Sequence, residues 1–237
     1  MNMMVKLLQL MSKINQPVSV VISTRQINDE FLKHVEKMFS HPKTEVNIYE
    51  NDNVSSLTEI YNIGLKDSKN DIVVFMHDDI ILETTNMTPK IIKLFEKHPE
   101  YGIIGVAGTN KLTSGTWWQN RENMFGVVGH IHEGKRHVNK YSKEVFNDVL
   151  KEVVVVDGLF FMVHKGRIKK NFNEQFEGFH FYDISFCVEN FLEGVKIGVT
   201  TKIGLTHKSI GMTNIKWEKN RLLFEALNEK SLPLTTE

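Results

Sequence analysis

The tripeptide His77-Asp78-Asp79 contains the residues whose types and spacing most directly suggest chemistry. It follows residues 71–76, an apolar and partly β-branched run after a polar turn, which predicts a buried strand. Open α/β sheets bind ligands at the carboxyl ends of their strands. Two adjacent carboxylates there repel each other, and a divalent cation such as Mg²⁺ or Mn²⁺ would relieve that repulsion. An acidic turn that caps the next helix explains the tripeptide equally well.

Four further groups of residues could act at the same place, and each has a structural alternative. Asp183 lies just before a predicted helix, so it could accept a proton or simply cap that helix. His207 could be a metal ligand or an ordinary core or surface histidine. Asp157 and Gly158 could face a substrate or form a turn. For Trp117 and Trp118, which could stack on a sugar face, we expect one residue to pack in the core and Trp118 to line a cleft.

Three histidines of the middle segment have an alternating spacing that could bind a transition metal. They are His130, His132 and His137. No matching set of cysteines or acids accompanies them, so we expect a solvated loop there.

Strands and helices alternate along the chain and predict the frame that positions these residues. We expect strands at residues 18–23, 45–50, 71–76, 102–107, 152–157 and 195–200. We expect helices at residues 28–39 and 57–66, after a cap at Thr88, and at about residues 183–193 and 215–229. This alternation predicts an α/β fold with a mainly parallel central sheet and helices on both faces. Residues 109–151 break the pattern and predict loops, with a short hairpin over the sheet edge as the alternative.

Composition narrows the class of protein. The 237 residues allow one large α/β domain, for which we expect residues 17–230, between an extension at 1–16 and a loose tail at 231–237. Lys and Arg together number 29, as do Asp and Glu, so no overall basic charge favours a nucleic-acid partner, although a local patch stays open. No apolar run reaches the roughly 18 residues of a membrane span. The single Cys187 excludes an intramolecular disulfide and predicts a cytoplasmic protein, with peripheral membrane contact as the minor alternative.

Several motifs occur in a fixed order over about residues 18–217. They are Val-Val-Ile-Ser-Thr at 20–24, an acid after the second strand, Tyr-Asn-Ile-Gly at 61–64, His77-Asp78-Asp79, and Phe-x-x-x-Phe-x-Gly-Phe-x-x-Tyr-Asp at 172–183. This series resembles the family 2-like glycosyltransferases with the GT-A fold, and within them the branch sometimes labelled StrF-like. The resemblance implies a nucleotide-binding half at residues 17–108 and an acceptor and catalytic half at 109–230.

The resemblance also implies roles for individual residues. The family's Asp-x-Asp motif falls on His77-Asp78-Asp79, with His77 in place of the first acid. Asp79, His207 and His77 would hold the metal. Asp183 would be the general base, although Tyr182 replaces the acid that usually precedes it. Of the residues expected to contact the donor, the resemblance implies Ser23, Thr24, Arg25, Glu50, Asn51, Asn62, His77 and Asp78. Trp118, Asp157 and Gly158 are expected there from their own chemistry and their places in the chain.

The implied function is metal-dependent, inverting transfer of a sugar from a nucleotide-diphosphate donor to an acceptor hydroxyl. We expect Mn²⁺ or Mg²⁺ and a UDP-sugar. The acceptor would be a glycan, a lipid-linked glycan or another hydroxyl compound, with nucleic acid less expected. A non-catalytic nucleotide-sugar or glycan-binding module is the main alternative. A sugar nucleotidyltransferase is disfavoured because residues 23–30 contain no glycine for a phosphate loop. A metal-dependent hydrolase would need more ligands at strand ends.

Overall fold

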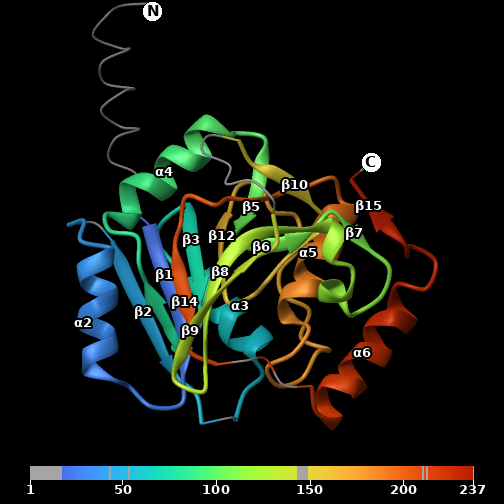
Figure 1. The fold of residues 1–237 in the computed structure, drawn as a ribbon, viewed down its shortest axis with the longest axis horizontal. Coiled ribbons are helices and arrows are strands. Elements are labelled where there is room, and N and C mark those ends of the chain that lie inside the picture. The colour runs from blue at the N-terminus through green and yellow to red at the C-terminus, as the bar shows by residue number, and fades with distance from the viewer. Residues whose placement is uncertain are drawn as a thin grey trace, which may run out of the picture.

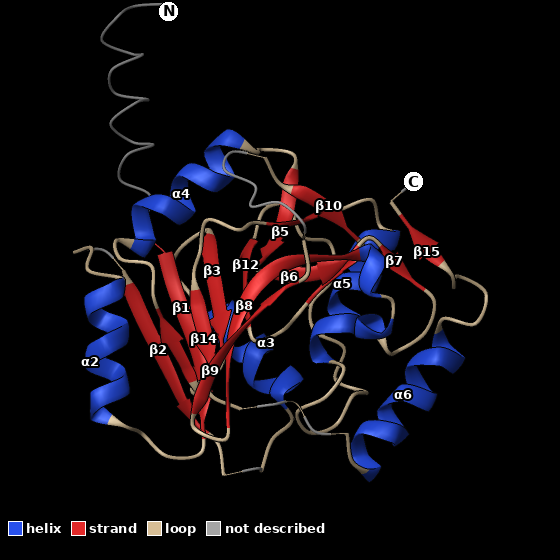
Figure 2. Cartoon of the chain, viewed as in Figure 1, coloured by secondary structure: helices blue, strands red, loops and turns tan. Residues whose placement is uncertain are grey.

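A computed structural model describes residues 18–42, 44–52, 54–142, 149–209, 211 and 213–236. A seven-stranded sheet in the order β10-β13-β5-β12-β3-β1-β2 forms the core of this part of the chain (Figure 1). Its strands are β1 (Val18–Thr24), β2 (Glu45–Glu50), β3 (Ile72–Met76), β5 (Tyr101–Gly105), β10 (Lys151–Val153), β12 (Phe160–His164) and β13 (Lys196–Val199). The helices are α2 (Asp29–Met38), α3 (Leu57–Asp67), α4 (Met87–Lys97), α5 (Tyr182–Leu192) and α6 (Ile215–Leu227). Helices flank the strands in Figure 2, and the expected α/β class is confirmed.

The parallel part of the sheet carries the predicted site. Strand β1 pairs in parallel with both β2 and β3, so the carboxyl ends of these strands meet at one edge. From β1 the chain passes through α2 to β2 on one side, and it then returns through α3 to β3 on the other side of β1. Because both crossovers are expected to be right-handed, these opposite directions put α2 and α3 on opposite faces of the sheet. Gly64 lets α3 approach β1 closely, because a Cβ there would lie 2.5 Å from Val21 Cγ1.

Polar caps start the first helices where the sequence predicts them. Asn28 accepts a hydrogen bond from the third residue of α2, and Ser56 opens a capping box at α3. The expected cap at Thr88 is wrong. Asn86 precedes α4 in a left-handed conformation with φ 53°, and Thr88 lies buried inside the first turn. Its hydroxyl hydrogen-bonds to the Thr44 hydroxyl at 2.8 Å instead of capping the helix.

Strand β12 was not predicted, and it changes the character of the sheet. It lies antiparallel between β3 and β5, with Phe161 opposite Phe75 on one side and Gly105 on the other. The sequence 160–164 is a short apolar run without alternation, which periodicity alone does not separate from a loop or a helix fragment. The central sheet therefore combines the parallel pairs with an antiparallel insertion.

A second sheet has the order β11-β6-β8-β14-β4, with β9 paired to β8. Its strands are β4 (Ile80–Leu82), β6 (Ala107–Thr109), β8 (Met124–His132), β9 (Lys135–Lys140), β11 (Val155–Val156) and β14 (Leu205–His207). The strand expected at residues 102–107 is divided at the buried Val106 into β5 of the central sheet and β6 of the second sheet. The strand expected at residues 152–157 is divided in the same way at the buried Val154, into β10 and β11. These breaks carry the chain from the central sheet into the second sheet, which a single hydrophobic run does not reveal.

The middle segment is more ordered than a set of loops. It contains strand β7 (Lys111–Leu112), the 3₁₀ turns η1 (Trp117–Gln119) and η2 (Arg121–Asn123), and the β8–β9 hairpin. The hairpin turns at Glu133 and Gly134, which have φ of 50° and 72°. Positive φ at both central residues is typical of tight hairpin turns. The hairpin alternative is therefore the one observed.

The structure corrects the prediction for the C-terminal tail. Leu234 and Thr235 form β15 (Leu234–Thr235), which pairs with β7, so the expectation of a loose tail is wrong there. The predicted extension at residues 1–16 lies outside the described residues. Within the described part of the chain, no helix combines the length and the apolar composition that membrane crossing requires.

Candidate active site

Strand pairing brings the predicted metal ligands together. The segment His77–Asp79 follows β3 directly, and β4 begins at the next residue. Strand β14 pairs antiparallel with β4, with His207 opposite Ile80. This pairing places His207, which is 130 positions after His77, beside the strand-end carboxylate.

Three side chains converge on one point. His207 Nε2 lies 3.0 Å from Asp79 Oδ1, and His77 Nδ1 lies 3.9 Å from the same oxygen. The two imidazole nitrogens are 3.5 Å apart. Asp79 Oδ1 is buried and faces the ring nitrogens of both histidines. A buried carboxylate oxygen facing two imidazole nitrogens is the arrangement expected of ligands around a cation.

The protonation states fit metal binding. Burial alone would raise the pKa of the Asp79 carboxyl, but hydrogen bonding to His207 and its charge hold that pKa below the ordinary range. Burial lowers the pKa of His77, and the neighbouring His207 lowers it further. Asp79 is therefore an anion at neutral pH and His77 is neutral, which leaves both with lone pairs for a metal. Burial would lower the pKa of His207, but its hydrogen bond to Asp79 and the Asp79 charge raise that pKa, so a metal bound there would displace a proton.

The donor set also discriminates between metals. The described residues contain one cluster of this kind, formed by His77, Asp79 and His207, with ligand atoms within 4.8 Å of one another. Carboxylate oxygens suit both Mg²⁺ and Mn²⁺, whereas imidazole nitrogens suit transition metals. Two imidazoles and one carboxylate fit Mn²⁺ better than Mg²⁺.

Asp78 points away from this cluster. Its Oδ2 accepts a hydrogen bond of 2.6 Å from the Thr24 hydroxyl at the end of β1. Both residues line a separate hollow of about 480 Å³, together with Gln26, Asp79 and Lys208. The tripeptide thus forms a wall between two cavities, with His77 on one side and Asp78 on the other.

Asp183 is the second residue of α5, two positions after the cap residue Phe181, so it is not the cap of that helix. Its Oδ2 accepts a hydrogen bond of 2.8 Å from the Gly158 amide, and its Oδ1 accepts one of 2.9 Å from the Ile184 amide. Burial and the charge of Asp157 raise its pKa from 3.8 to about 7, although these backbone amides oppose the shift. A carboxylate with a pKa near neutrality can accept a proton and later release it.

Tyr182, beside Asp183, connects α5 to the cluster of His77, Asp79 and His207. Its hydroxyl lies 2.6 Å from His77 Nε2, the ring nitrogen remote from Asp79. Gly158 makes this possible, because a Cβ at that position would overlap the Tyr182 hydroxyl. Sequence reasoning treated Tyr182 only as the replacement of an expected acid and missed this contact. The available signal was a tyrosine adjacent to the proposed base.

One cavity of about 740 Å³ joins most of these groups. His77, His207, Asp157 and Asp183 line it, as do all three tryptophans of the chain. Trp117 is 6 % exposed and Trp118 is 39 % exposed. Trp217, which sequence reasoning did not single out, lies with its ring centroid 5.8 Å from that of Trp118.

The histidines of the middle segment also belong to this cavity. His130, His132 and His137 all line it, and His130 pairs with His137 across the β8–β9 hairpin. The His130 ring lies 5.9 Å from that of His207. The expectation of a loop is wrong, because these residues form the β8–β9 hairpin, which β14 joins by pairing with β8. His132 and His137 are nevertheless exposed, as a solvated segment predicts. The Glu-Gly turn at residues 133–134 was the sequence signal for the β8–β9 hairpin.

The remaining residues expected at the donor lie outside this cavity. Thr24 and Glu50 are paired at the ends of β1 and β2, and the exposed Arg25 guanidinium lies 5.9 Å over the Phe179 ring. Ser23 precedes them in β1 and is partly buried. Asn51 uses its side chain within its own loop, through Val54 and Ser55.

Asn62 binds the segment that precedes α5. Its amide group donates to Phe172 O at 2.9 Å and to Glu174 Oε1 at 2.8 Å, and its oxygen accepts from the Phe172 amide. The Tyr-Asn-x-Gly motif thus ties α3 to residues 172–174. In this structure the side chain is fully engaged in that contact.

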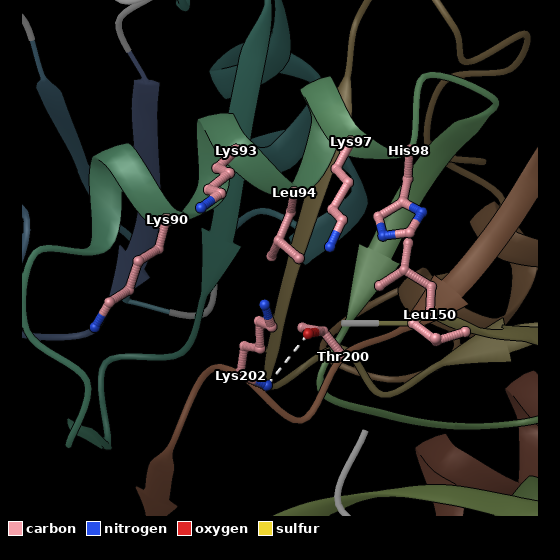
Figure 3. Close-up of a pocket in the computed structure, with 9 residues that line it drawn as sticks. Lys90, Lys93, Leu94, Lys97, His98, Leu150, Thr200 and Lys202 are labelled. Carbon is pink, nitrogen blue, oxygen red and sulfur yellow. Dashed lines mark hydrogen bonds between the residues drawn. The ribbon is translucent and has the colours of Figure 1, made fainter. Parts of the chain in front are cut away.

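A further hollow lies away from the cluster, between α4 and the turn after β13 (Figure 3). Lys90, Lys93 and Lys97 of α4 line it together with Lys202, and its volume is about 260 Å³. None of the residues lining it is a carboxylate or one of the predicted site residues. The chemistry of the protein is therefore better placed at the larger cavity.

Known structures resemble this chain in fold. A structure of GalNAc-T7 with UDP, GalNAc and Mn²⁺ superposes with a TM-score of 0.59 at 9 % identity, covering 90 % of this chain and 48 % of that one. The chain thus spans about half the length of that relative. A197 from STIV aligns over 84 % of this chain and 97 % of its own length, with a TM-score of 0.47 and 11 % identity. The likeness to the GalNAc-T7 structure confirms the expected GT-A fold.

At the level of sequence, no curated protein matches the chain. A family profile does match it, over residues 18–225, which includes every strand and helix from β1 to most of α6. The matched range contains the His77, Asp79 and His207 cluster as well as Asp183. On this match the chain belongs to the "Glycosyltransferase like family".

Proposed function

We propose that the protein transfers a sugar from a UDP-sugar to an acceptor hydroxyl, with Mn²⁺ as the metal and Asp183 as the general base. The observation that carries the proposal is the convergence of His77, His207 and Asp183 on one cavity beside Asp79. The GalNAc-T7 structure, which holds UDP, GalNAc and Mn²⁺, supports the donor and the metal by its shared fold.

Each part of the site would have a separate task. His77, Asp79 and His207 would hold the metal, whose charge would stabilise the leaving diphosphate. The expected donor contacts at the ends of β1 and β2 are Ser23, Thr24, Arg25, Glu50 and Asn51. Asp78 would bind the ribose side, because Thr24 holds its carboxylate on the opposite side from His77. Asp157 and Gly158 remain proposed donor-sugar contacts, and Asn62 is a proposed contact that would require its present hydrogen bonds to change. The exposed Trp118, also expected at the donor from the sequence, is better assigned to the acceptor side of the cavity.

The proposed reaction is a single displacement. The acceptor oxygen bonds to the anomeric carbon while the bond from that carbon to the diphosphate oxygen breaks, and its electron pair leaves with UDP. The hydroxyl proton passes to Asp183. Its pKa of about 7 supports this role, because the carboxylate is partly ionised at neutral pH and still basic enough to accept a proton. One direct displacement inverts the anomeric centre.

Two finer assignments remain proposals. The order of motifs supports the StrF-like branch, and the lone Cys187, which is buried, is compatible with a cytoplasmic location. The acceptor would be a glycan, a lipid-linked glycan or another hydroxyl compound.

The test is to incubate the protein with Mn²⁺ and a panel of UDP-sugars, and to measure the nucleotide product. A transferase releases UDP, with slow hydrolysis in the absence of acceptor, whereas a nucleotidyltransferase would release pyrophosphate. Asp183→Asn should remove turnover and retain UDP binding. Release of no product from any donor, together with UDP binding, would favour a binding module.

A further inference from the structure

The larger cavity has an aromatic wall built from segments far apart in the sequence. Trp118 of η1 and Trp217 of α6 have ring centroids 5.8 Å apart with an interplanar angle of 54°. Trp117 packs edge-on against Trp118 at 6.1 Å, and Phe181 lies 5.6 Å from Trp217. Trp117 and Phe181 are buried, so they support the wall, whereas Trp118 is 39 % exposed. Trp118 and Trp217 together are called the tryptophan platform below.

Polar contacts hold the platform in place. The Gly115 amide before η1 donates to Glu225 Oε1 of α6 at 3.2 Å. The Asn220 side chain of α6 donates to Glu177 O at 2.9 Å and to His180 O at 3.1 Å. These bonds tie η1 and the segment before α5 to the same helix. The platform is thus a preformed surface, which limits the entropy lost when a ligand binds to it.

The rest of the cavity offers hydrogen-bonding groups and little positive charge. Asn139 and Tyr141 line it, together with the hairpin histidines. Among the described residues that line it, Arg121 is the only lysine or arginine, and Asp157 and Asp183 oppose its charge. Apart from the proposed metal, which would face the diphosphate of the donor, a phosphorylated or otherwise strongly anionic acceptor would find no cluster of lysine or arginine side chains here.

We infer that the acceptor is an uncharged saccharide whose terminal ring stacks on the tryptophan platform. This inference rests on the proposed function, because it assumes that the hydroxyl to be glycosylated faces Asp183 in the same cavity. The C–H face of a sugar ring is apolar and fits an indole surface, while its hydroxyl groups need polar partners such as Asn139 and Tyr141. The donor's base is not the expected occupant, because Thr24, Arg25 and Glu50 do not line this cavity.

The test measures saccharide contact directly. The protein saturated with UDP and Mn²⁺ is mixed with lactose, cellobiose or chitobiose, and saturation-transfer NMR and titration report contact and affinity. We expect at least one disaccharide to bind, with the strongest transfer to ring C–H protons. Trp118→Ala should weaken that affinity about tenfold, and Trp118→Phe should restore most of it, because a ring can still stack. Tyr49→Ala, an aromatic change on β2 outside the cavity, is the matched control and should have no effect.

Three results would overturn the inference. The first is that none of the disaccharides contacts the UDP- and Mn²⁺-saturated protein. The second is that glucose 6-phosphate and mannose 6-phosphate bind better than the neutral sugars. The third is that Trp118→Ala weakens UDP binding as much as saccharide binding, which would assign the platform to the nucleotide. Saccharide contact in a protein that binds no UDP would support the platform and refute the proposed donor, so the two failures are distinguishable.

Discussion

The Tyr182 hydroxyl lies 2.6 Å from His77 Nε2, on the side of the imidazole opposite to Asp79. Burial raises the pKa of Tyr182 well above its usual value, and the neighbouring Asp183 adds to the shift, so the hydroxyl stays protonated. In one tautomer of His77, Nε2 carries the ring proton and donates a hydrogen bond to the Tyr182 oxygen. The lone pair of Nδ1 then faces Asp79. That tautomer is the one a metal ligand needs. We therefore propose that Tyr182 positions His77 as a ligand.

Removing this hydroxyl should weaken metal binding. We expect Tyr182→Phe to lower Mn²⁺ affinity by about 10- to 100-fold, the usual effect of losing a partner that orients a histidine ligand. Isothermal titration with Mn²⁺ measures this without turnover. Tyr49→Phe removes a hydroxyl that contacts Asp67 on the surface and serves as the control. Equal Mn²⁺ affinity in both variants would show that the tyrosine does not orient the ligand.

The metal cluster itself predicts a preference for Mn²⁺ over Mg²⁺, because two of its three proposed ligands are imidazoles. UDP should bind tightly with Mn²⁺, less tightly with Mg²⁺ and weakly in EDTA. Asp79→Asn should weaken metal-dependent UDP binding and turnover together, since it removes the only anionic ligand of the cluster. Asp71→Asn, an exposed position just before β3, is the control. The idea fails if EDTA leaves UDP affinity unchanged.

Asp183 predicts the pH dependence of catalysis. Because its pKa is about 7, turnover should fall as the pH drops through 7 and the base becomes protonated. Asp183→Asn should lower turnover by roughly 10²- to 10⁴-fold while UDP and Mn²⁺ binding change little. A pH–rate profile of the wild-type protein and single-concentration assays of the variant provide the measurements.

The same variant separates catalysis from a structural role. The folded-state pKa of Asp183 is raised above its ordinary value, so its contribution favours the folded state at low pH and is lost as the pH rises through about 7. Asp183→Asn removes this pH dependence but leaves one of the two backbone amides without an acceptor, so we expect a modest fall in melting temperature, and turnover per folded molecule decides the role of the residue. A clear fall in melting temperature with normal turnover per molecule would instead make Asp183 a structural residue. Asp157 would then be the next candidate for the base.

The stereochemistry of the product tests the single-displacement mechanism. Direct attack on the anomeric carbon, with Asp183 taking the proton, inverts the configuration. Proton NMR of the glycoside formed from a UDP-α-sugar should show a β linkage. If water is the acceptor, the free sugar should first appear as the β anomer, so it must be measured before it isomerises. An α-linked product would require a different mechanism and a second group able to face the anomeric carbon.

Much of the fold and part of the site could be predicted from local sequence. Runs of apolar residues located β1, β2 and β3, and short polar caps located the starts of α2 and α3. The rule that ligands gather at the carboxyl ends of strands singled out Asp79. The strand and helix predictions succeeded because periodicity and capping depend on residues close together in the chain, and the place of Asp79 at a strand end follows from the same local pattern.

Only the tertiary structure decided which distant residues share the site. His207 reaches Asp79 through the pairing of β14 with β4, and Trp217 reaches Trp118 through the packing of α6. Strand β12 enters the middle of the sheet, and the hairpin histidines line the cavity, for the same reason. Strand register and helix packing are set by contacts between segments far apart in sequence, which leave no periodic signal in either segment alone.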